Sequence, residues 1–351
     1  MYVFLQKDIM NNRRTNLSDI AKKAGVSKSA VSLALNGSNG VSEQTRKRVE
    51  TVAKAMGYER NALVSSMMSS IKRDGSSKYS ETIALVNGNI DEFALTNHPT
   101  LPKYCQGIKE EALRLGYTIN EFWLHDTNLN GEQFARILHS RGIRGGIILG
   151  HSFGTVFPKS FEEVWQNFYF ISAGIKTQQP QLEMVSADHY AITYQAVLKA
   201  LDMGYKRPAL VIEENIDNLV DGRFVAGFLR AQMRLTLKQH IPPFLKTDTH
   251  PNYDKELEDW ITTHKPDVLL YLLNTTRETL LSKIQKQNKP IKLIQLERRS
   301  VLQNWTGMEQ NNDTVGRIAM RRLADMLSRT SSVVGENANL VTLVPPTWIT
   351  E

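Results

Sequence analysis

Residues 15–36 read TNLSDIAKKAGVSKSAVSLALN, and this stretch decides the fold of the N-terminal part of the chain. The spacing of Ala21, Gly25 and Val31 is typical of a helix-turn-helix. A small residue lets the two helices cross closely, and a glycine adopts the positive φ of the turn at little cost. Ser27 is suited to cap the second helix, because its hydroxyl can accept from a backbone N–H that the helix leaves unpaired.

A third helix is expected over residues 43–56, capped by Ser42 and ended by Gly57. The inward positions of the three helices are small or apolar, as a packed bundle requires. They are Ile20, Ala21, Ala24, Val26, Ala30, Val31, Ala34, Leu35, Val49, Val52, Ala53 and Met56.

The outward face of the second helix carries side chains that can read DNA. In a helix-turn-helix this helix enters the major groove, where Lys28 can donate to guanine and Leu33 can contact a thymine methyl. The expected base-reading residues are Lys28, Ser29, Ser32 and Leu33. The expected phosphate contacts, which position the head, are Ser27, Asn36, Thr45 and Arg46. The alternative is a three-helix bundle that does not bind DNA.

The positive charge is confined to the first fifth of the 351-residue chain. Residues 1–73 hold 13 Lys and Arg against 5 Asp and Glu, whereas the remainder holds 30 against 31. A basic head on a near-neutral body is the charge distribution expected of a nucleic-acid-binding protein. Charge alone leaves open a solvated basic face without a nucleic-acid partner.

Beyond residue 80, short apolar runs alternate with amphipathic helical patterns. The expected strands are 82–86, 117–124, 145–149, 168–173, 209–212, 268–272 and 291–296. The expected helices are 104–115, 131–140, 191–203, 222–234, 276–287 and 314–328. Such alternation predicts parallel sheets covered by helices, and two series predict two lobes. The cleft between the lobes, at the carboxyl ends of the strands, is the expected small-molecule site.

Nothing in the sequence indicates catalysis, a cofactor or a bound metal. Gly145-Gly146 precedes an apolar run, whereas a phosphate-binding loop follows one, and Cys105 is the one cysteine. No apolar run reaches the roughly 18 residues that a membrane-spanning helix needs. No secretory signal is recognisable. We therefore expect a cytoplasmic protein that is not an enzyme and does not enter a membrane.

The head resembles that of the LacI/GalR family of bacterial transcription regulators. The similarity runs without a gap over residues 15–68 and includes TNLSDIAKKAGVS, AVS, LNG, VSEQTRKRV and GY. The resemblance implies a homodimer whose two heads read a pseudo-palindromic operator in double-stranded DNA. It also implies a hinge helix and a two-lobed body shaped like the periplasmic sugar-binding proteins.

The resemblance implies the following division of the chain: arm 1–14, helix-turn-helix DNA-binding domain 15–60, hinge helix 61–71, linker 72–81, and effector-binding and dimerisation domain 82–351. Within that domain we expect a first lobe of residues 82–204 and 310–330, and a second lobe of residues 205–309 and 331–351. No leucine heptads follow the last expected strand, which favours a dimer over a helix-bundle tetramer.

Two sites follow from the resemblance alone. Asn61 and Met67 fall in the hinge, where Met67 takes the place of an apolar wedge that kinks DNA at the minor groove; plain dimer packing is the alternative. The positions that correspond to effector contacts are Asp188, Arg223, Asn274 and Glu297. Helix capping is an alternative for Asp188, and a surface salt bridge is an alternative for Arg223.

The sequence favours a DNA-binding transcription regulator, a repressor controlled by a small-molecule effector, of which a carbohydrate is one candidate. Two other classes stay open. One is a solute-binding protein with a vestigial head, and the other is an enzyme built on the α/β body.

Overall fold

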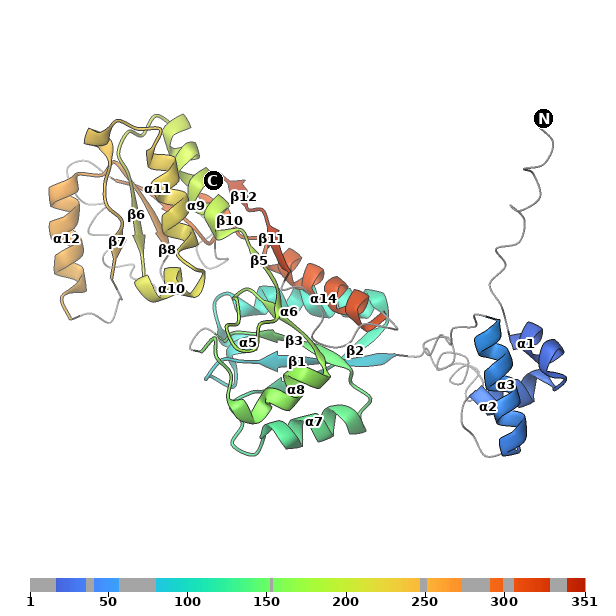
Figure 1. The fold of residues 1–351 in the computed structure, drawn as a ribbon. Coiled ribbons are helices and arrows are strands. Elements are labelled where there is room, and N and C mark those ends of the chain that lie inside the picture. The colour runs from blue at the N-terminus through green and yellow to red at the C-terminus, as the bar shows by residue number, and fades with distance from the viewer. Residues whose placement is uncertain are drawn as a thin grey trace, which may run out of the picture. The chain divides into compact units, whose positions relative to one another are not determined.

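The computed structural model describes residues 17–35, 41–56, 80–151, 154–246, 251–272, 291–298, 306–328 and 340–350. The chain divides into two compact units, Met1–Ser77 and Lys78–Glu351. The first unit holds the head and the second holds the body (Figure 1), and each has a hydrophobic core of its own.

In its described residues the head has the three expected helices, which are α1 (Leu17–Ala24), α2 (Lys28–Leu35) and α3 (Glu43–Ala55). Gly25 makes the turn between α1 and α2 with a φ of 64°, in the left-handed region that favours glycine. The Val26 N–H donates to the Ala21 carbonyl at 3.1 Å and closes the turn. The buried core is Ile20, Ala21, Ala24, Val31, Ala34, Val49 and Ala53.

The first lobe of the body is a parallel sheet in the order β11-β5-β4-β3-β1-β2. Its strands are β1 (Glu81–Asn87), β2 (Tyr117–Trp123), β3 (Gly145–Leu149), β4 (Tyr169–Ala173), β5 (Glu183–Ala187) and β11 (Val341–Val344). One face is covered by α5 (Ala94–Asn97), α6 (Leu101–Leu115) and α14 (Asn312–Ser328). The other face is covered by α7 (Gly131–Ser140) and α8 (Glu162–Asn167).

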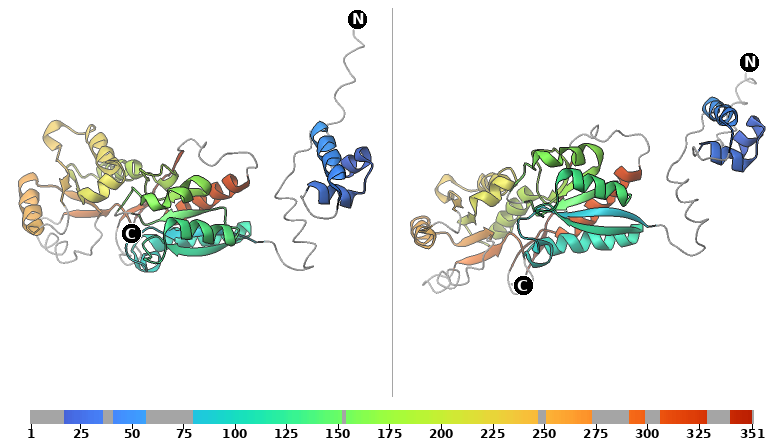
Figure 2. Two further views of the ribbon diagram at one scale, coloured as in Figure 1. Left: turned by 60° about the horizontal axis from the view of Figure 1, so that its bottom comes forward. Right: turned by 90° about the horizontal axis from the view of Figure 1, so that it is seen from below.

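The second lobe is a sheet in the order β12-β10-β9-β8-β6-β7, in which only β12 runs antiparallel to its neighbour among the described strands. Its strands are β6 (Pro208–Ile212), β7 (Phe244–Leu245), β8 (Val268–Leu272), β9 (Lys292–Gln295), β10 (Gly307–Glu309) and β12 (Thr347–Ile349). One face packs against α9 (His189–Asp202), α10 (Glu214–Leu219) and α11 (Arg223–Gln232), and the other against α12 (Tyr253–His264). Figure 2 shows the two sheets from two further directions.

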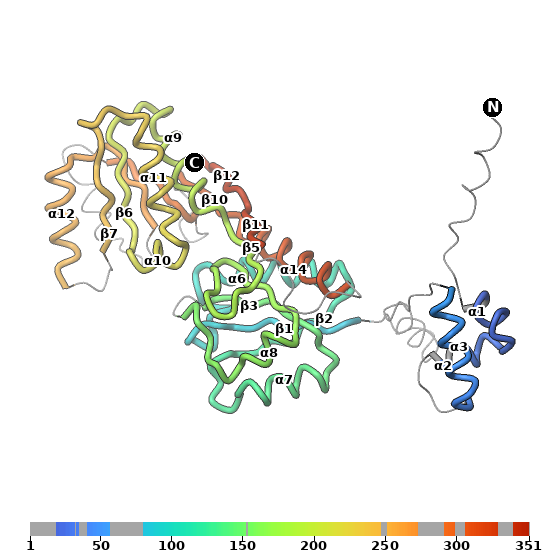
Figure 3. The backbone as a smooth tube through the Cα atoms, in the orientation of Figure 1, coloured from blue at the N-terminus to red at the C-terminus, as the bar shows by residue number. Residues whose placement is uncertain are grey.

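Within the described residues, the chain crosses between the lobes at 187–189, 309–312 and 344–347 (Figure 3). Hydrogen bonds tie these crossings to one another. The Asp188 N–H donates to the Val344 carbonyl at 2.8 Å, and the Asn311 amide donates to the Pro345 carbonyl at 2.9 Å. The crossings therefore form one connected hinge region.

The expected fold class is confirmed, but two lobe assignments are wrong. Helix α9 lies in the second lobe, not the first, because the chain crosses directly after β5 and the apolar side of α9 packs on α11 and β8. Strand β11 lies in the first sheet, not the second, because it pairs in parallel register with β5. The expected helix at 276–287 lies outside the described residues.

Helices α6 and α14 approach each other closely at two glycines. A Cβ on Gly107 would overlap the carbonyl oxygen of Asp313, and a Cβ on Gly316 would overlap that of Tyr104. The close approach lets α14, late in the chain, complete the core of the first lobe.

We expect Gly316→Ala to lower the free energy of unfolding of the body by about 2 kcal/mol, because the added methyl forces apart two packed helices. The sign of this change in the free energy of unfolding is informative, since replacing glycine by alanine in a helix without close neighbours would raise it by about 1 kcal/mol. Urea unfolding of the full chain measures the change. Gln106→Ala, at an exposed position beside Gly107, is the control and should shift stability by less than about 0.5 kcal/mol. A stabilised Gly316→Ala variant would contradict the close packing.

Candidate functional site

The start of α2 presents the side chains that were expected to read bases. Ser27 accepts a hydrogen bond from the Ala30 N–H at 3.1 Å and so caps the helix as predicted. Lys28 and Ser29 are exposed, and Leu33 keeps 37% of its surface accessible. Leu33 therefore presents part of its apolar side chain at the surface of the head. Ser32 lies on α2, but its side chain is outside the described part of the chain.

The first turn of α3 carries two of the expected phosphate contacts. The Ser42 hydroxyl accepts from the Thr45 N–H at 3.3 Å and lies 2.9 Å from the Thr45 hydroxyl. The Arg46 guanidinium lies 3.7 Å from the carboxylate of Glu43, one turn earlier. Helix N-termini favour anions, so Thr45 and Arg46 sit where a phosphate would be stabilised. Asn36, Asn61 and Met67 lie outside the described residues, and their assignments stay predictions.

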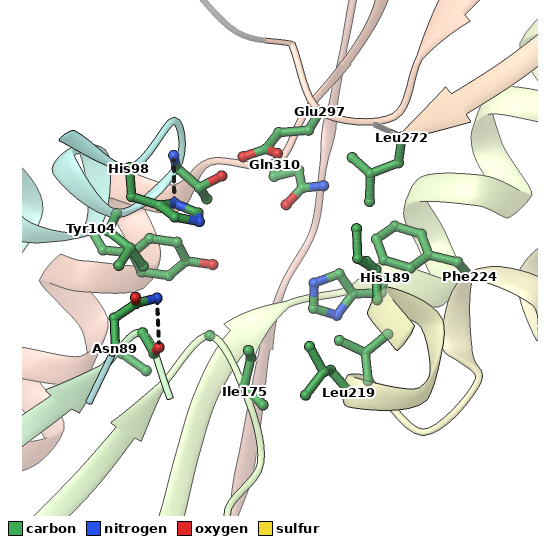
Figure 4. Close-up of a pocket in the computed structure, with 17 residues that line it drawn as sticks. Asn89, His98, Tyr104, Ile175, His189, Leu219, Phe224, Leu272, Glu297 and Gln310 are labelled. Carbon is green, nitrogen blue, oxygen red and sulfur yellow. Dashed lines mark hydrogen bonds between the residues drawn. The ribbon is translucent and has the colours of Figure 1, made fainter. Parts of the chain in front are cut away.

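The body holds a cavity of about 140 Å³ between its two lobes. Its lining comes from the carboxyl ends of several strands, which is where parallel sheets bind ligands. Figure 4 shows the residues around it. Each lobe contributes both polar and apolar residues to the lining.

The polar side chains that the first lobe contributes are those of Asn89, His98, Thr100 and Tyr104. Asn89 is fixed by donating from its amide to the Gly150 carbonyl at 3.2 Å. The Nδ1 atom of His98 accepts from the Thr100 N–H at 3.1 Å. Burial, and then the negative charge of Glu297, raise the pKa of the Tyr104 hydroxyl, which therefore keeps its proton. This wall thus offers donors and acceptors held in fixed positions.

The opposite wall is formed mainly by aliphatic and aromatic side chains: Ile216, Leu219, Val220, Phe224 and Leu272. Glu297, at the end of β9, adds a carboxylate, which accepts from the Asn312 amide at 3.3 Å. Gln310, on a crossing, also lines the cavity and donates to the Leu296 carbonyl at 3.0 Å.

Two neighbouring residue pairs join the first crossing to α11. Asp188 caps α9 by accepting from the Ala191 N–H at 3.1 Å, and its carboxylate forms an ion pair with Arg223 at 3.1 Å. The next residue of each pair, His189 and Phe224, lines the cavity, and their ring centroids are 4.8 Å apart. The ion pair outside the cavity therefore positions the two rings that face into it.

His189 is 7% exposed, and burial lowers its pKa to about 4. The positive charge of Arg223 lowers the pKa further, while the negative charge of Asp188 opposes this. At neutral pH the His189 ring is therefore uncharged and can serve as a hydrogen-bond donor or acceptor.

The four expected effector positions have different surroundings. Glu297 lines the cavity, whereas Asp188 and Arg223 do not and are bonded to each other. Asn274 lies outside the described residues. The sequence analysis did not assign His98, Tyr104 or Gln310 to this site.

Two further searches of the structure concern the described residues only. They contain no helix that is both long and apolar enough to cross a membrane. They also contain no cluster of three or more His, Cys, Asp or Glu side chains arranged to hold a metal ion.

Residues 16–61 match a family model described as "Bacterial regulatory proteins, lacI family". The HTH-type transcriptional regulator MalR of Streptococcus pneumoniae is 26% identical over 195 residues, covering 56% of this chain and 56% of that protein. The HTH-type transcriptional repressor CytR of Escherichia coli K12 is 28% identical over 191 residues, covering 54% of this chain and 51% of that protein. The chain thus spans about half the length of these curated relatives.

Solved structures share the fold. A complex of the transcriptional regulator CelR with cellobiose aligns with a TM-score of 0.58 at 16% identity, covering 96% of this chain and 99% of that chain. The Lac repressor dimer bound to operator and the anti-inducer ONPF aligns with a TM-score of 0.53 at 18% identity, covering 96% of this chain and 98% of that one. These alignments extend the likeness from the head to the two-lobed body.

The depressed pKa of His189 predicts that the body loses stability in acid. The unfolded chain takes up a proton near the ordinary histidine pKa of 6.5, but the folded protein resists it until about pH 4. The free energy of unfolding should therefore fall as the pH drops from about 6.5 to 4, by about 3 kcal/mol for this residue.

Urea unfolding at several pH values measures this loss. The buried His151, whose pKa burial also lowers to about 4, contributes in the same direction. His189→Gln should therefore flatten the pH dependence in part. An unchanged slope in this variant would contradict the assignment.

Proposed function

We propose that this chain, which belongs to the lacI family of bacterial regulatory proteins, is a sequence-specific transcriptional repressor. It binds a pseudo-palindromic operator as a homodimer, and a small molecule in the cavity between its lobes controls that binding. The observation that carries the proposal is the exposed face of α2. Lys28 and Ser29 follow the Ser27 cap directly, and Leu33 lies about one turn further along the same helix.

The DNA contacts follow from this face. Lys28 donates to a guanine edge or a phosphate, Ser29 and Ser32 bond to base edges, and Leu33 packs against a thymine methyl. The phosphate contacts that fix the head in the groove are Ser27, Asn36, Thr45 and Arg46. Asn61 and Met67 contact the minor groove at the operator centre, with Met67 as the apolar wedge.

Dimerisation is part of the proposal because one head presents one recognition helix. Two copies related by a two-fold axis read two half-sites, so the symmetry of the operator mirrors that of the protein. The Lac repressor, which shares this fold, was solved as an operator-bound dimer. This supports the arrangement proposed here.

Ligand control acts through the distance between the lobes. The cavity takes residues from both lobes and from two of the crossings, so a bound molecule would contact both lobes at once. Two ion pairs also span the lobes, Lys103–Glu309 at 3.1 Å and Lys176–Asp221 at 3.7 Å. A ligand that prefers one lobe separation shifts the population toward it and changes DNA affinity only through that difference.

The effector residues of this proposal are Glu297 and Asn274 as direct contacts, with Asp188 and Arg223 as positioning residues. The Asp188–Arg223 pair holds His189 and Phe224 at the cavity. The carbohydrate in the related CelR complex supports an uncharged polar molecule as one candidate effector.

Lys28→Ala tests the recognition helix. We expect operator affinity to fall about 10- to 100-fold and the preference at one position of each half-site to relax, because a lysine contact to a base edge is lost. Selection of binding sites from a random DNA library, with the full chain, measures both changes. Lys238→Ala removes the same charge from an exposed position in the body and is the matched control. A Lys28→Ala selection identical to that of the parent would refute the base contact.

Arg46→Ala tests a phosphate contact instead. Binding should weaken by a similar factor for every DNA sequence, and the slope of log affinity against log salt should become shallower by about one per head. Titrations of one operator and one unrelated duplex over a range of salt concentrations measure this. A changed sequence preference with an unchanged salt slope would show that Arg46 does not contact a phosphate.

A further inference from the structure

The outer side of α11 carries apolar side chains that the core of the second lobe does not use. Leu229 and Met233 keep 47% and 69% of their surfaces accessible, and Leu237, in the short turn that follows the helix, keeps 85%. Residues four apart lie on the same side of a helix, so Leu229 and Met233 form one stripe. Phe228 and Ala231, on the inner side, are buried in the core. Large apolar side chains that cluster at a surface, in contrast to a single one, mark a site of contact with another molecule.

Each of these apolar residues is followed directly by a basic one. Arg230, Arg234 and Lys238 are all exposed, and residues 224–239 contain no aspartate or glutamate. In the part of the chain that the structure describes, none of these three cations forms a salt bridge. The Arg230 guanidinium lies 3.4 Å from the Met233 sulfur, so the basic and the apolar side chains adjoin. Six residues together form the α11 surface: Leu229, Arg230, Met233, Arg234, Leu237 and Lys238.

Hydrogen bonds hold the backbone beneath the α11 surface in place. The Gln232 side chain accepts from the Ile241 N–H at 2.8 Å and donates to the Ile241 carbonyl at 3.1 Å. The Arg207 guanidinium donates to the Lys238 carbonyl at 3.0 Å. A surface whose backbone is already fixed loses little conformational entropy when a partner binds to it.

The stability of the second lobe does not account for the α11 surface. Cations near the C-terminus of a helix interact favourably with its dipole, which gives Arg230 and Arg234 a local role. The same argument does not extend to Leu229 and Met233, because an apolar side chain stabilises a fold in proportion to the area that it removes from water. None of the six residues lines the cavity between the lobes, so the ligand site does not explain them either.

We propose that the α11 surface docks an acidic amphipathic helix of a partner protein. Apolar side chains of that helix pack on Leu229, Met233 and Leu237, and its carboxylates pair with the three adjoining cations. A partner helix that lies along α11 presents side chains on one side at the same helical spacing, which matches both the apolar and the basic residues. The interaction is additional to the proposed function, since it involves neither the DNA-reading face of α2 nor the cavity.

The described helices of this chain do not supply such a partner themselves. Among them α12 carries the most carboxylates, four in all. Its apolar side chains Tyr253, Leu257 and Ile261 are buried in the second lobe. Because α12 cannot offer an apolar stripe together with its carboxylates, a second copy of this helix does not fit the α11 surface.

The small apolar area favours a protein over a membrane as the partner. A helix that lies on a membrane sinks a continuous apolar face about 5–10 Å into the headgroup region. Here Phe224 and Phe228, the aromatic residues of α11, are packed in the core of the lobe. The remaining apolar side chains suit a contact with one facing helix.

Peptide selection on the full-length protein tests the proposal. A phage-displayed library of helical peptides with randomised surface positions is selected in the presence of excess duplex DNA, which occupies the basic head. The recovered peptides are then counter-selected on a double variant, Leu229→Ser with Met233→Ser. We expect peptides that the parent retains and the double variant does not, with apolar residues at helical spacing beside aspartate or glutamate.

Fluorescence anisotropy then measures the Kd of one recovered peptide. Met233→Ala and Arg234→Ala should each weaken binding by about tenfold, because one removes apolar contact and the other an ion pair. Added salt should also weaken binding, since exposed ion pairs are screened. Val156→Ala and Arg136→Ala, at exposed positions of the first lobe, are the matched controls and should leave the Kd unchanged. Thermal melting verifies that each variant is folded.

Several outcomes overturn the proposal. An empty selection, peptides that the double variant retains as well as the parent, or recovered peptides without acidic residues would each do so. Cosedimentation of the parent, but not of the double variant, with phosphatidylglycerol vesicles would assign the surface to a membrane instead. Operator binding is measured in parallel and should be equal for the parent and the double variant, so a failure of the proposed function is seen separately.

Discussion

The hinge region between the lobes is the constraint on which the body depends. In the described residues, its three crossings are tied by the Asp188–Val344 and Asn311–Pro345 hydrogen bonds, so relative motion of the lobes turns about one place. His189 and Gln310 lie on these crossings and also line the cavity. A molecule bound in this cavity would therefore contact two of the crossings directly.

Beside this hinge, an ion pair and a contact between two aromatic rings are formed by neighbouring residues. Asp188 and Arg223 neutralise each other outside the cavity, while His189 and Phe224 contact each other inside it. Phe224 lines the cavity, whereas the guanidinium of the preceding Arg223 pairs with Asp188 and does not line it. Among the described residues that line the cavity there is accordingly no lysine or arginine.

The helices of the head could be predicted from the sequence because the interactions that define them join residues close together in the chain. Caps such as Ser27, the Gly25 turn and the apolar spacing act within a few residues, and the structure has them all. The lobe boundaries failed at α9 and β11 because sheet membership depends on distant pairing, here of β11 with β5. In the cavity, Glu297 was found by its alignment with a family position. His98 and Tyr104 were not identified, because no motif marks their positions and only the folded chain brings them to the cavity.

The separate hydrophobic cores of the head and the body have an evolutionary consequence. Among the described residues, the buried core of the head runs from Ile20 to Ala53, and the buried clusters of the two lobes consist of residues of the body. A recombination event between α3 and β1 would therefore leave both cores complete. The head and the body of such a chain could therefore be exchanged separately without removing residues from the buried core of the other.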